Sequence, residues 1–344
     1  MITAELHARR SFRLADYPIP EPGPGEVQAR VHAVGICGSD LHNYTEGSVG
    51  DTPCTYPAVL GHEPAGVITK TGAGVSGWSR GDRVALEPAI YCYHCEFCMT
   101  GHHNVCAGIR FMSAPPDPGY FREYVTVPAA NLLPLPSNLS FAEATVFEPL
   151  AVALHSLTFA QLAPMETAAV FGAGPIGLLT VAMLRLSGAG RVYAVDPVEA
   201  RRGLALQMGA DAAIDPAAVE PSAQILAETG RRGVDVAIDC AAKEGSLNQC
   251  FRAARNAGRV VMTGIPSEIY VPIEFHTMRR KELRLYNVRR SNHESEAALH
   301  LLHERPRLFA PLVTHIRKLD QIQPAFEMLE AYSDGAGKIV IDCA

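Results

Sequence analysis

The sequence predicts an α/β protein with two domains, one rich in β-strands and one built on a doubly wound parallel sheet. The chain has 344 residues, of which 48% are hydrophobic and 19% charged, so it is long enough to bury more than one core. Roughly the first 148 residues are dense in Pro, Gly and short apolar runs, whereas from about Thr167 apolar runs alternate with helical stretches. We therefore place a β-rich domain in residues 1–150 and 287–344, and an α/β domain in residues 151–286.

In the β-rich region, short apolar runs are separated by turn residues, which is typical of an antiparallel, partly barrel-like domain. The expected strands are residues 27–34, 65–68, 83–86 and 124–127. After about Tyr286, a helical stretch at 294–304 and a last apolar run at 338–341 indicate that the chain returns to this domain.

The α/β region alternates strands and helices, a pattern that predicts a parallel sheet covered by helices on both faces. The expected strands are residues 168–171, 192–195, 212–214, 234–238 and 260–263. The expected helices are residues 175–187, 199–208, 222–228 and 246–256.

Charge and cysteine content narrow the possible functions. The formal net charge is −6, so the chain has no basic surplus with which to bind nucleic acid or an anionic membrane. No run approaches the ~20 apolar residues of a membrane span. Nine cysteines, an odd number with four crowded between Cys92 and Cys106, indicate a metal site rather than a disulfide framework. We expect a cytoplasmic protein that acts on a small molecule.

A phosphate-binding motif follows the first expected strand of the α/β domain. It has the form GxGxxG, and its residues are Gly172, Ala173, Gly174, Pro175, Ile176 and Gly177. Gly172 serves the turn, Gly174 a close approach of the pyrophosphate, and Gly177 the packing of helix on strand. The amino end of the following helix then binds the diphosphate. The motif in this context predicts a Rossmann-type dinucleotide-binding domain.

The choice between NAD and NADP depends on an acid at the end of the next strand. Asp196 stands 19 residues beyond Gly177, where a carboxylate accepts from both ribose hydroxyls and repels a 2′-phosphate. This favours NAD. Arg201 and Arg202 follow on the next helix and could instead neutralise a 2′-phosphate, or remain solvated with Arg201 over the adenine.

Four cysteines form the most specific motif of the sequence. Cys92, Cys95, Cys98 and Cys106 lie within 15 residues in a loop-like segment. Four thiolates close a tetrahedral zinc site completely, which is a structural and not a catalytic arrangement. Iron–sulfur clusters use the same ligands, but no partner redox motif accompanies them here.

A second constellation is dispersed along the chain and has different chemistry. Its members are Cys37, His62, Glu63 and Glu148. A thiolate, an imidazole and a carboxylate leave a fourth position open for water or substrate, as a catalytic zinc requires. Taken singly, Cys37 could be a core residue and Glu148 a helix-terminal charge; taken together, with glycines flanking the cysteine and preceding the histidine, they favour a metal site.

Over essentially its whole length the chain resembles the zinc-containing medium-chain dehydrogenases, closest to their sorbitol (polyol) branch. The segments that carry the resemblance are GICGSDLH at 35–42, LGHEPAG at 60–66, the four-cysteine loop, FEPLAVALH at 147–155, GAGPIG at 172–177 and VRRSN at 288–292. It implies a GroES-like catalytic domain and a Rossmann cofactor domain. Glu148 stands where simple-alcohol enzymes carry a cysteine, which indicates the polyol branch.

The resemblance also implies roles for individual residues. The implied zinc ligands are Cys37, His62 and Glu63. Glu148 either coordinates the zinc or holds its water, and the two carboxylates exchange during turnover. Ser39 and His42 are implied as a relay that carries the alcohol proton outward, while Asp196 fixes the adenosine ribose.

The implied substrate pocket departs from the family pattern. Phe111 and Arg289 fall where the branch shapes its polyol pocket, but Arg290 stands where an aromatic residue is common, and Asn43 where a tyrosine is common. A second cation suits a carboxylated or phosphorylated sugar. The alternative is that Arg290 points away and pairs with a surface acid.

We therefore expect an enzyme with two zinc ions per chain that transfers a hydride from a secondary alcohol of a polyol or sugar-derived substrate, including a sugar acid, to NAD. The resemblance and the apolar stretch 269–275, after the last expected parallel strand, indicate a homodimer or homotetramer. Two alternatives remain: a threonine-type amino-alcohol dehydrogenase of the same fold, of whose recognition pair only the arginine half is visible, and a non-catalytic zinc-stabilised NAD-binding protein.

Overall fold

The computed structural model describes residues 1–344, which fold into two compact units. The first consists of Met1–Glu148 and Ser295–Ala344, and the second of Pro149–Glu294. The first is rich in strands and the second contains a parallel sheet with helices, so the predicted fold class is confirmed.

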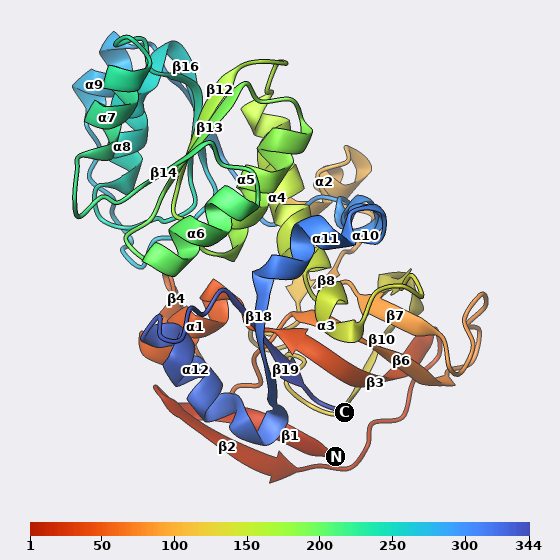
Figure 1. The fold of residues 1–344 in the computed structure, drawn as a ribbon. Coiled ribbons are helices and arrows are strands. Elements are labelled where there is room, and N and C mark those ends of the chain that lie inside the picture. The colour runs from red at the N-terminus through yellow and green to blue at the C-terminus, as the bar shows by residue number, and fades with distance from the viewer. The chain divides into compact units, whose positions relative to one another are not determined.

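A seven-stranded sheet forms the frame of the first unit (Figure 1). Its order is β11 (Leu132–Pro134), β7 (Arg83–Leu86), β6 (Glu63–Thr71), β3 (Glu26–Gly35), β19 (Lys338–Asp342) and β18 (Val313–Lys318), while β10 (Tyr124–Pro128) also pairs with β3. Every pair is antiparallel except β18 with β19, which is parallel. The inward side chains of β3, Val27, Ala29 and Val31, are spaced by two and fully buried, as the period of a strand requires.

Short strands and helices surround this sheet. The strands are β1 (Ile2–Ala8), β2 (Ser11–Asp16), β4 (Ser48–Val49), β5 (Thr52–Pro53), β8 (Ala89–Ile90) and β9 (Arg110–Phe111). The helices are α1 (Gly38–Thr45), α2 (Glu96–Met99), α3 (Phe141–Ala144), α10 (Ser295–Glu304), α11 (Pro306–Phe309) and α12 (Ile322–Glu330). Tyr44 of α1 and Phe326 of α12 are buried, with ring centroids 5.1 Å apart, so α12 fixes the helix that follows Cys37.

The second unit is built on six parallel strands. Their order is β14 (Ala212–Ile214), β13 (Arg191–Val195), β12 (Thr167–Phe171), β15 (Val234–Asp239), β16 (Ala254–Met262) and β17 (Arg284–Asn287). This is the order 3-2-1-4-5-6 of a doubly wound fold, whose strand order reverses between β12 and β15. Ligands of such sheets bind at the carboxyl ends of the strands near this reversal.

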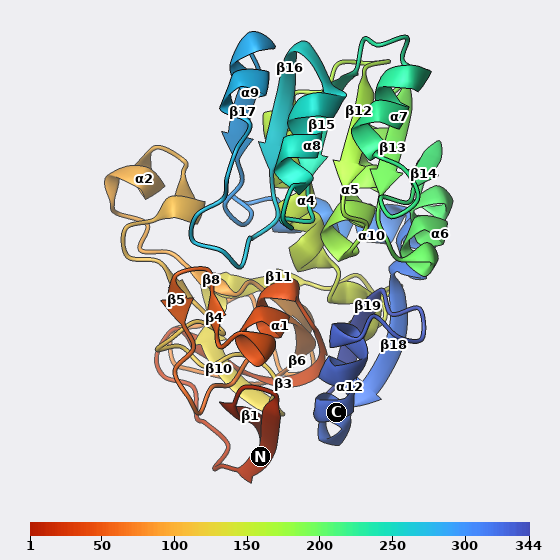
Figure 2. The same cartoon turned by 90° about the vertical axis from the view of Figure 1, so that its left-hand side faces the viewer.

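Helices cover both faces of the parallel sheet. They are α4 (Phe147–Ala160), α5 (Pro175–Leu186), α6 (Glu199–Gln207), α7 (Pro221–Glu228), α8 (Ser246–Ala253) and α9 (Phe275–Arg280). Figures 1 and 2 show α7 and α8 on one face and α5 and α6 on the other. None of the helices has the length and apolar character needed to cross a bilayer.

Two details differ from the sequence prediction. The helix expected at 246–256 ends at Ala253, and β16 begins at once at Ala254. The ammonium of Lys281 donates to the carbonyls of Phe251, Arg252 and Ala254, which satisfies the last acceptors of α8 from outside the helix. In addition, β17 adds a sixth parallel strand after the apolar stretch 269–275, where no strand was expected.

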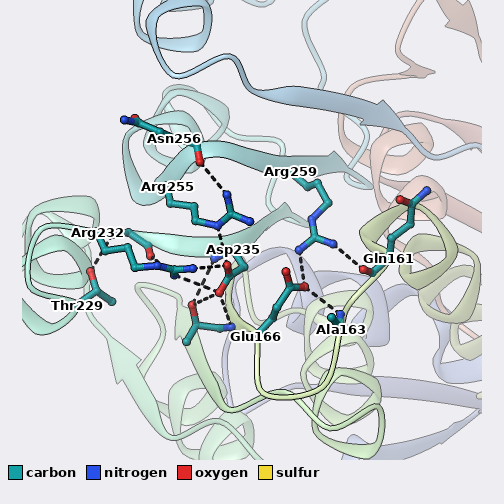
Figure 3. Close-up of polar contacts among 11 residues, drawn as sticks. Gln161, Ala163, Glu166, Thr229, Arg232, Asp235, Arg255, Asn256 and Arg259 are labelled. Atoms are coloured by element: carbon teal, nitrogen blue, oxygen red, sulfur yellow. Dashed lines mark hydrogen bonds and ion pairs between the residues drawn. The ribbon is translucent and has the colours of Figure 1, made fainter.

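Ion pairs, with Asp235 buried and its arginine partners partly exposed, lie at the amino ends of the parallel strands (Figure 3). Asp235, at the start of β15, accepts from Arg232 and Arg255, at 2.6 Å each, and from the backbone N–H of Thr167 at 2.9 Å. Close by, Arg259 of β16 pairs with Glu166 and donates to the carbonyl of Gln161. This edge is thus committed to internal contacts, and the opposite, carboxyl edge carries the glycine motif.

Candidate metal centre and dinucleotide site

Asp40 holds together the two segments that carry the predicted metal ligands Cys37 and His62. Its buried carboxylate accepts from the backbone N–H of Cys37 at 3.1 Å and from that of Gly61 at 3.0 Å. The first contact caps α1 directly after Cys37, and the second fixes the residue before His62. A buried carboxylate with several donors is stable only in a defined geometry, so Asp40 fixes both ligand positions.

Three of the predicted ligands meet in the structure. The donor atoms of Cys37, His62 and Glu63 all lie within 4.8 Å of one another. Nδ1 of His62 faces Oδ1 of Asp40 at 3.5 Å, which leaves Nε2 for a metal. Burial lowers the pKa of His62, but Asp40 and Cys37 outweigh it and raise that pKa well above its usual range. The Phe111 ring lies 5.3 Å from the His62 ring, so this predicted pocket residue adjoins the cluster.

Glu63 is engaged by a residue that the sequence analysis did not single out. Nζ of Lys338 lies 2.6 Å from both carboxylate oxygens of Glu63 and 3.0 Å from the carbonyl of Ile36, which precedes Cys37. Gly35 permits this position of Glu63, because a Cβ at Gly35 would lie 1.9 Å from Oε2 of Glu63. Burial lowers the pKa of Lys338, but Glu63 and Cys37 outweigh it and raise that pKa. Glu63 therefore has a resident cation.

Glu148 lies at the start of α4 and is buried. Burial raises its pKa to about 7; the charge of His62 lowers that pKa and the charge of Glu63 raises it. Burial disfavours the ionised form of this carboxyl group, and a nearby metal cation would stabilise that form. The thiolate, imidazole and carboxylate donors, together with this carboxyl group, fit a catalytic zinc.

The four-cysteine motif forms a second metal-binding cluster. The sulfur atoms of Cys92, Cys95, Cys98 and Cys106 all lie within 4.8 Å of one another. Backbone N–H groups point at these sulfurs, such as that of Cys95 toward Cys92 at 3.4 Å. Such donors, those of Cys98 and Ala107 above all, lower the pKa of Cys95 to about 6. Four thiols arranged in this way fit a closed, structural zinc site.

The glycine motif has the geometry of a phosphate-binding loop. Gly172 has φ +94°, and a Cβ there would lie 2.7 Å from the backbone nitrogen of Ala241. A Cβ on Gly177 would lie 1.8 Å from the carbonyl of Gly172, whereas one on Gly174 would project into open space. Gly174 caps α5, which begins with Pro175 and Ile176 and whose amino end is free of side-chain caps. The loop therefore fits a diphosphate lying over Gly174.

Asp196 directly follows β13 at the carboxyl edge of the sheet and is buried. Its carboxylate accepts from the backbone N–H of Ala173 and of Val198, at 2.8 Å each, so it is fixed against the glycine loop. Arg202 is turned elsewhere: it donates to the carbonyl of Asp196 at 2.8 Å and pairs with Asp215 at 3.2 Å. Arg201 lies on α6 and is half-buried.

The predicted relay residues lie on α1. Ser39 and His42 are three residues apart, which places them on adjacent turns of one helix face. Nδ1 of His42 lies 3.0 Å from Oε1 of Glu46, one turn further on. Glu46 is exposed, so a hydrogen-bonded route leads from His42 to solvent.

Arg289 and Arg290 follow β17 at the carboxyl edge of the parallel sheet. Arg289 is exposed and Arg290 half-buried, and Arg290 has the left-handed φ of 54°. Both arginines thus belong to the second unit, whereas Cys37 and His62 belong to the first.

Two residues of the metal centre were missed by sequence reasoning. Asp40 offered a signal, because it is the charged residue one turn after Cys37 in GICGSDLH. Lys338 offered no such signal, because a lysine at the start of an expected strand is usually a solvent-exposed charge. Only the pairing of β19 with β3 brings it to Glu63.

A metal-ligating cluster of mixed donors, a second cluster of four thiols, and a doubly wound sheet with a phosphate-binding loop define a zinc-dependent, dinucleotide-linked oxidoreductase. Residues 23–137 match the alcohol dehydrogenase GroES-like domain, and residues 175–304 match the zinc-binding dehydrogenase domain. The chain belongs to the family of zinc-binding alcohol dehydrogenases. It is an enzyme that uses zinc and NAD.

Named relatives share nearly the full length of the chain. Sorbitol dehydrogenase of Bacillus subtilis (strain 168) is 33% identical over 341 residues, which are 99% of this chain and 97% of the relative. Sorbitol dehydrogenase of Homo sapiens is 35% identical over 98% of this chain and 94% of the relative.

Solved structures agree with this relationship. A protein of Escherichia coli CFT073, described as a short chain alcohol dehydrogenase and complexed with NADH, superimposes with a TM-score of 0.90 at 30% identity, over 99% of both chains. Galactitol-1-phosphate dehydrogenase of Escherichia coli has a TM-score of 0.90 at 26% identity, over 99% of this chain and 100% of its own. L-idonate 5-dehydrogenase of Escherichia coli K-12 has the same score and identity, over 99% and 97%.

Proposed function

We propose that this enzyme oxidises a secondary alcohol of a polyol or sugar-derived substrate and passes the hydride to NAD. The observation that carries the proposal is the convergence of Cys37, His62 and Glu63, with the buried carboxyl of Glu148 under their electrostatic influence. Zinc bound there supplies a Lewis acid that stabilises negative charge on the substrate oxygen, and bound NAD accepts the hydride. The named relatives support a polyol as substrate.

In this proposal the residues of the chain have distinct roles. Cys37 and His62 bind the metal, with Glu148 or Glu63 as the third protein ligand. Asp40 holds the Cys37 and His62 segments in place. Ser39 and His42 would relay the proton of the alcohol outward by way of the nicotinamide ribose, and the contact of His42 with Glu46 would continue the route to water.

The structural cluster and the domain division complete the proposal. Cys92, Cys95, Cys98 and Cys106 hold a second zinc that stabilises the fold of the loop without touching substrate. We assign zinc binding and catalysis to residues 1–150 and 287–344, and dinucleotide binding to residues 151–286.

Selectivity for NAD over NADP rests on Asp196. Its carboxylate is fixed at the end of β13, and Arg202, a candidate partner for a 2′-phosphate, is paired with Asp215. In the bound state Arg201 stacks on the adenine. We expect Asp196→Ser to weaken the binding of NAD and to lower the ratio of kcat/KM for NAD to kcat/KM for NADP. A wild-type enzyme that already prefers NADP would contradict the assignment.

A substrate with an anionic group is our more specific proposal. Arg289 and Arg290 stand together in sequence, and an arginine binds carboxylate or phosphate with two parallel hydrogen bonds. Two structural relatives are named for a sugar phosphate and a sugar acid. Phe111, whose ring lies 5.3 Å from that of His62, is our candidate for an apolar contact with the substrate near the metal cluster.

We propose a homo-oligomer, a dimer or a tetramer, in the cytoplasm. Between β16 and α9 an apolar stretch is exposed; its large side chains are Ile269, Tyr270, Val271, Ile273 and Phe275. Monomers seldom leave such a stretch uncovered, and a second copy is the simplest cover. All nine cysteines are free, which suits a reducing compartment, and a formal net charge of −6 gives no basic surplus for nucleic acid or membrane. Light scattering that finds a monomer at micromolar concentration would contradict the oligomer.

The test of the proposed function is a substrate panel with purified, zinc-loaded enzyme. The panel contains neutral polyols, aldonates, sugar alcohol phosphates and amino alcohols, with NAD as acceptor and NADH absorbance as the signal. We expect turnover of polyols or sugar acids and none of threonine. Turnover of amino alcohols alone would replace the proposal with an amino-alcohol dehydrogenase, and no turnover with any secondary alcohol would reject it.

A further inference from the structure

The segment that carries Arg289 and Arg290 has an unusual backbone. It joins β17 to α10, and within four residues both Arg290 and His293 adopt left-handed φ values, 54° and 73°. Residues other than glycine disfavour this left-handed region, because Cβ then crowds the following carbonyl oxygen. A segment with two residues in this region keeps its conformation only when surrounding contacts hold it.

Both ends of this segment are tied down within the second unit. The backbone N–H of Val288 donates to the carbonyl of Met262 in β16 at 3.0 Å. At the other end, Oε1 of Glu294 lies 2.8 Å from Nδ1 of His155, and Oε2 of Glu294 accepts from the backbone N–H of Asn292. Burial raises the pKa of Glu294, but its contacts with His155 and Asn292 outweigh it and lower that pKa. Glu294 is therefore ionised at neutral pH.

His155 is itself firmly placed. It is buried on α4, and its ring packs edge-on against Phe159 at 5.1 Å; Phe159 in turn lies 5.9 Å from Tyr286 of β17. The hydroxyl of Ser156 lies 3.0 Å from that of Thr263, at the end of β16. These contacts join one face of α4 to the carboxyl ends of β16 and β17.

The same helix begins with Glu148. Glu148 and His155 are seven residues apart on α4, a spacing that places two side chains on one face of a helix, two turns apart. Glu148 and His155 thus belong to the same helix.

We propose that the His155–Glu294 pair is a positioning device that holds Arg289 and Arg290 in the conformation that recognises the anionic group of the substrate. The pair touches no substrate: it acts by fixing the backbone between Val288 and Glu294. The proposal rests on the proposed function for the anionic substrate, and it adds the residues that set this specificity.

Substitutions of His155 separate packing from hydrogen bonding. His155→Phe keeps an aromatic ring against Phe159 and removes the donor to Glu294, whereas His155→Asn restores a donor near the position of Nδ1. We expect His155→Phe to lower the ratio of anionic to neutral kcat/KM about tenfold, mainly through KM for the anionic substrate, since the loss of a hydrogen bond to a charged group typically changes an equilibrium constant by about tenfold or more. His155→Asn should recover most of that ratio.

A double-mutant cycle tests whether the effect passes through Arg290. In an Arg290→Tyr background, His155→Phe should leave the ratio of anionic to neutral kcat/KM unchanged. An equal, independent loss in both backgrounds would overturn the proposal, because His155 would then act by some other route. Glu294→Gln probes the pair from its other side and decides the matter if His155→Phe does not fold.

Hydrogen exchange supplies a readout that needs no substrate. In His155→Phe and Glu294→Gln, peptides covering residues 286–296 should exchange faster, while the zinc content and the Kd for NAD stay at their wild-type values. Unchanged exchange in that segment would overturn the positioning role. If the wild type oxidises no member of the substrate panel, the proposed function fails, and hydrogen exchange alone then decides whether the pair positions the segment.

Discussion

The ammonium of Lys338 is bonded to both carboxylate oxygens of Glu63, and neither side chain is exposed to solvent. The pair lies at the end of β3, next to Cys37, so one of the two carboxylates at the metal centre already has a resident cation. No ammonium is hydrogen-bonded to Glu148, and burial is the largest influence on its pKa. Glu148 is therefore the better candidate for the zinc ligand in the resting enzyme, and Glu63 is the alternative ligand.

Replacing Lys338 tests whether its ammonium, and not zinc, is the partner of Glu63. In Lys338→Met, Glu63 is left as a buried charge without its ammonium partner. We expect the zinc-free variant to lose about 3–5 kcal/mol of unfolding free energy, the usual effect of removing one partner of a buried ion pair. Zinc should restore more stability to the variant than to the wild type.

Lys338→Arg is the matched control, because a guanidinium keeps two donors for Glu63 and should keep the wild-type response to zinc. Urea denaturation with and without zinc gives both numbers. If Lys338→Met loses the same free energy in the zinc-free and the zinc-loaded protein, Lys338 does not govern Glu63.

The four-cysteine cluster should behave as a structural site. Cys95→Ser removes one of four ligands, so we expect metal analysis to find one zinc per chain instead of two, with a marked fall in Tm. In small zinc modules such a site contributes on the order of 10 kcal/mol. Cys250→Ser, at a buried cysteine outside both clusters, is the control and should keep two zinc ions. A Cys95→Ser protein with wild-type Tm would refute the structural role.

Asp235 gives a stability prediction with a defined pH window. Burial raises its pKa, but hydrogen bonds from Arg232, Thr167 and Arg255 outweigh burial and hold that pKa well below its usual range. A depressed carboxyl pKa means that the stabilisation is complete above the unfolded value of about 3.9 and is lost as the pH falls below it. Asp235→Asn should thus cost about 3 kcal/mol at pH 7 and progressively less below pH 4.

The control for Asp235 is an exposed ion pair. Glu21 and Lys70 are in contact at 2.6 Å but both are largely solvated, so Glu21→Gln should change the unfolding free energy by no more than about 1 kcal/mol. Urea denaturation between pH 3 and 8 measures both variants. A loss in Asp235→Asn that stays constant over this range would show that its charge is not the cause.

Arg290 provides the test of substrate charge. We expect Arg290→Tyr to lower kcat/KM for an aldonate or sugar phosphate by about tenfold or more, and to spare or improve a neutral polyol, because a lost charge-assisted contact costs a few kcal/mol. Arg289→Ala should impair both substrate classes, because we propose that Arg289 contacts either kind of substrate. If the ratio of anionic to neutral kcat/KM stays the same in Arg290→Tyr, a neutral-polyol dehydrogenase is the better description.

The local sequence pattern was sufficient to predict the features whose residues lie close together in the chain. The glycine motif, the alternation of strands and helices, and the four cysteines each lie within a short span of sequence, so spacing alone indicated their structure. The close approach of Gly177 to Gly172 and the open space at Gly174 follow directly from GxGxxG. The dispersed cluster was predicted from the donor chemistry of Cys37, His62 and Glu63, and the resemblance to a family then gave each residue its role.

Non-local pairing was out of reach of the sequence. Lys338 lies 275 residues from Glu63, and His155 lies 139 residues from Glu294, so nothing in the local pattern joins either pair. The end of α8 was misplaced for the same reason: the capping ammonium of Lys281 comes from the other side of α9, and helix propensity does not register it. Contacts between distant segments, once formed, decide which charges are buried and therefore which chemistry is possible.

The most direct measurement of the central claim is activity as a function of bound zinc. Enzyme stripped with a chelator is titrated with zinc, and NADH formation from the best polyol or sugar acid is followed together with the metal content. The account predicts no turnover when only the four-cysteine site is filled, and turnover that rises in proportion as the second zinc binds. Cys37→Ala should hold one zinc, fold, and remain inactive at any zinc concentration. Full activity with one zinc per chain, or an active Cys37→Ala enzyme, would contradict a catalytic zinc at Cys37, His62 and the paired carboxylates.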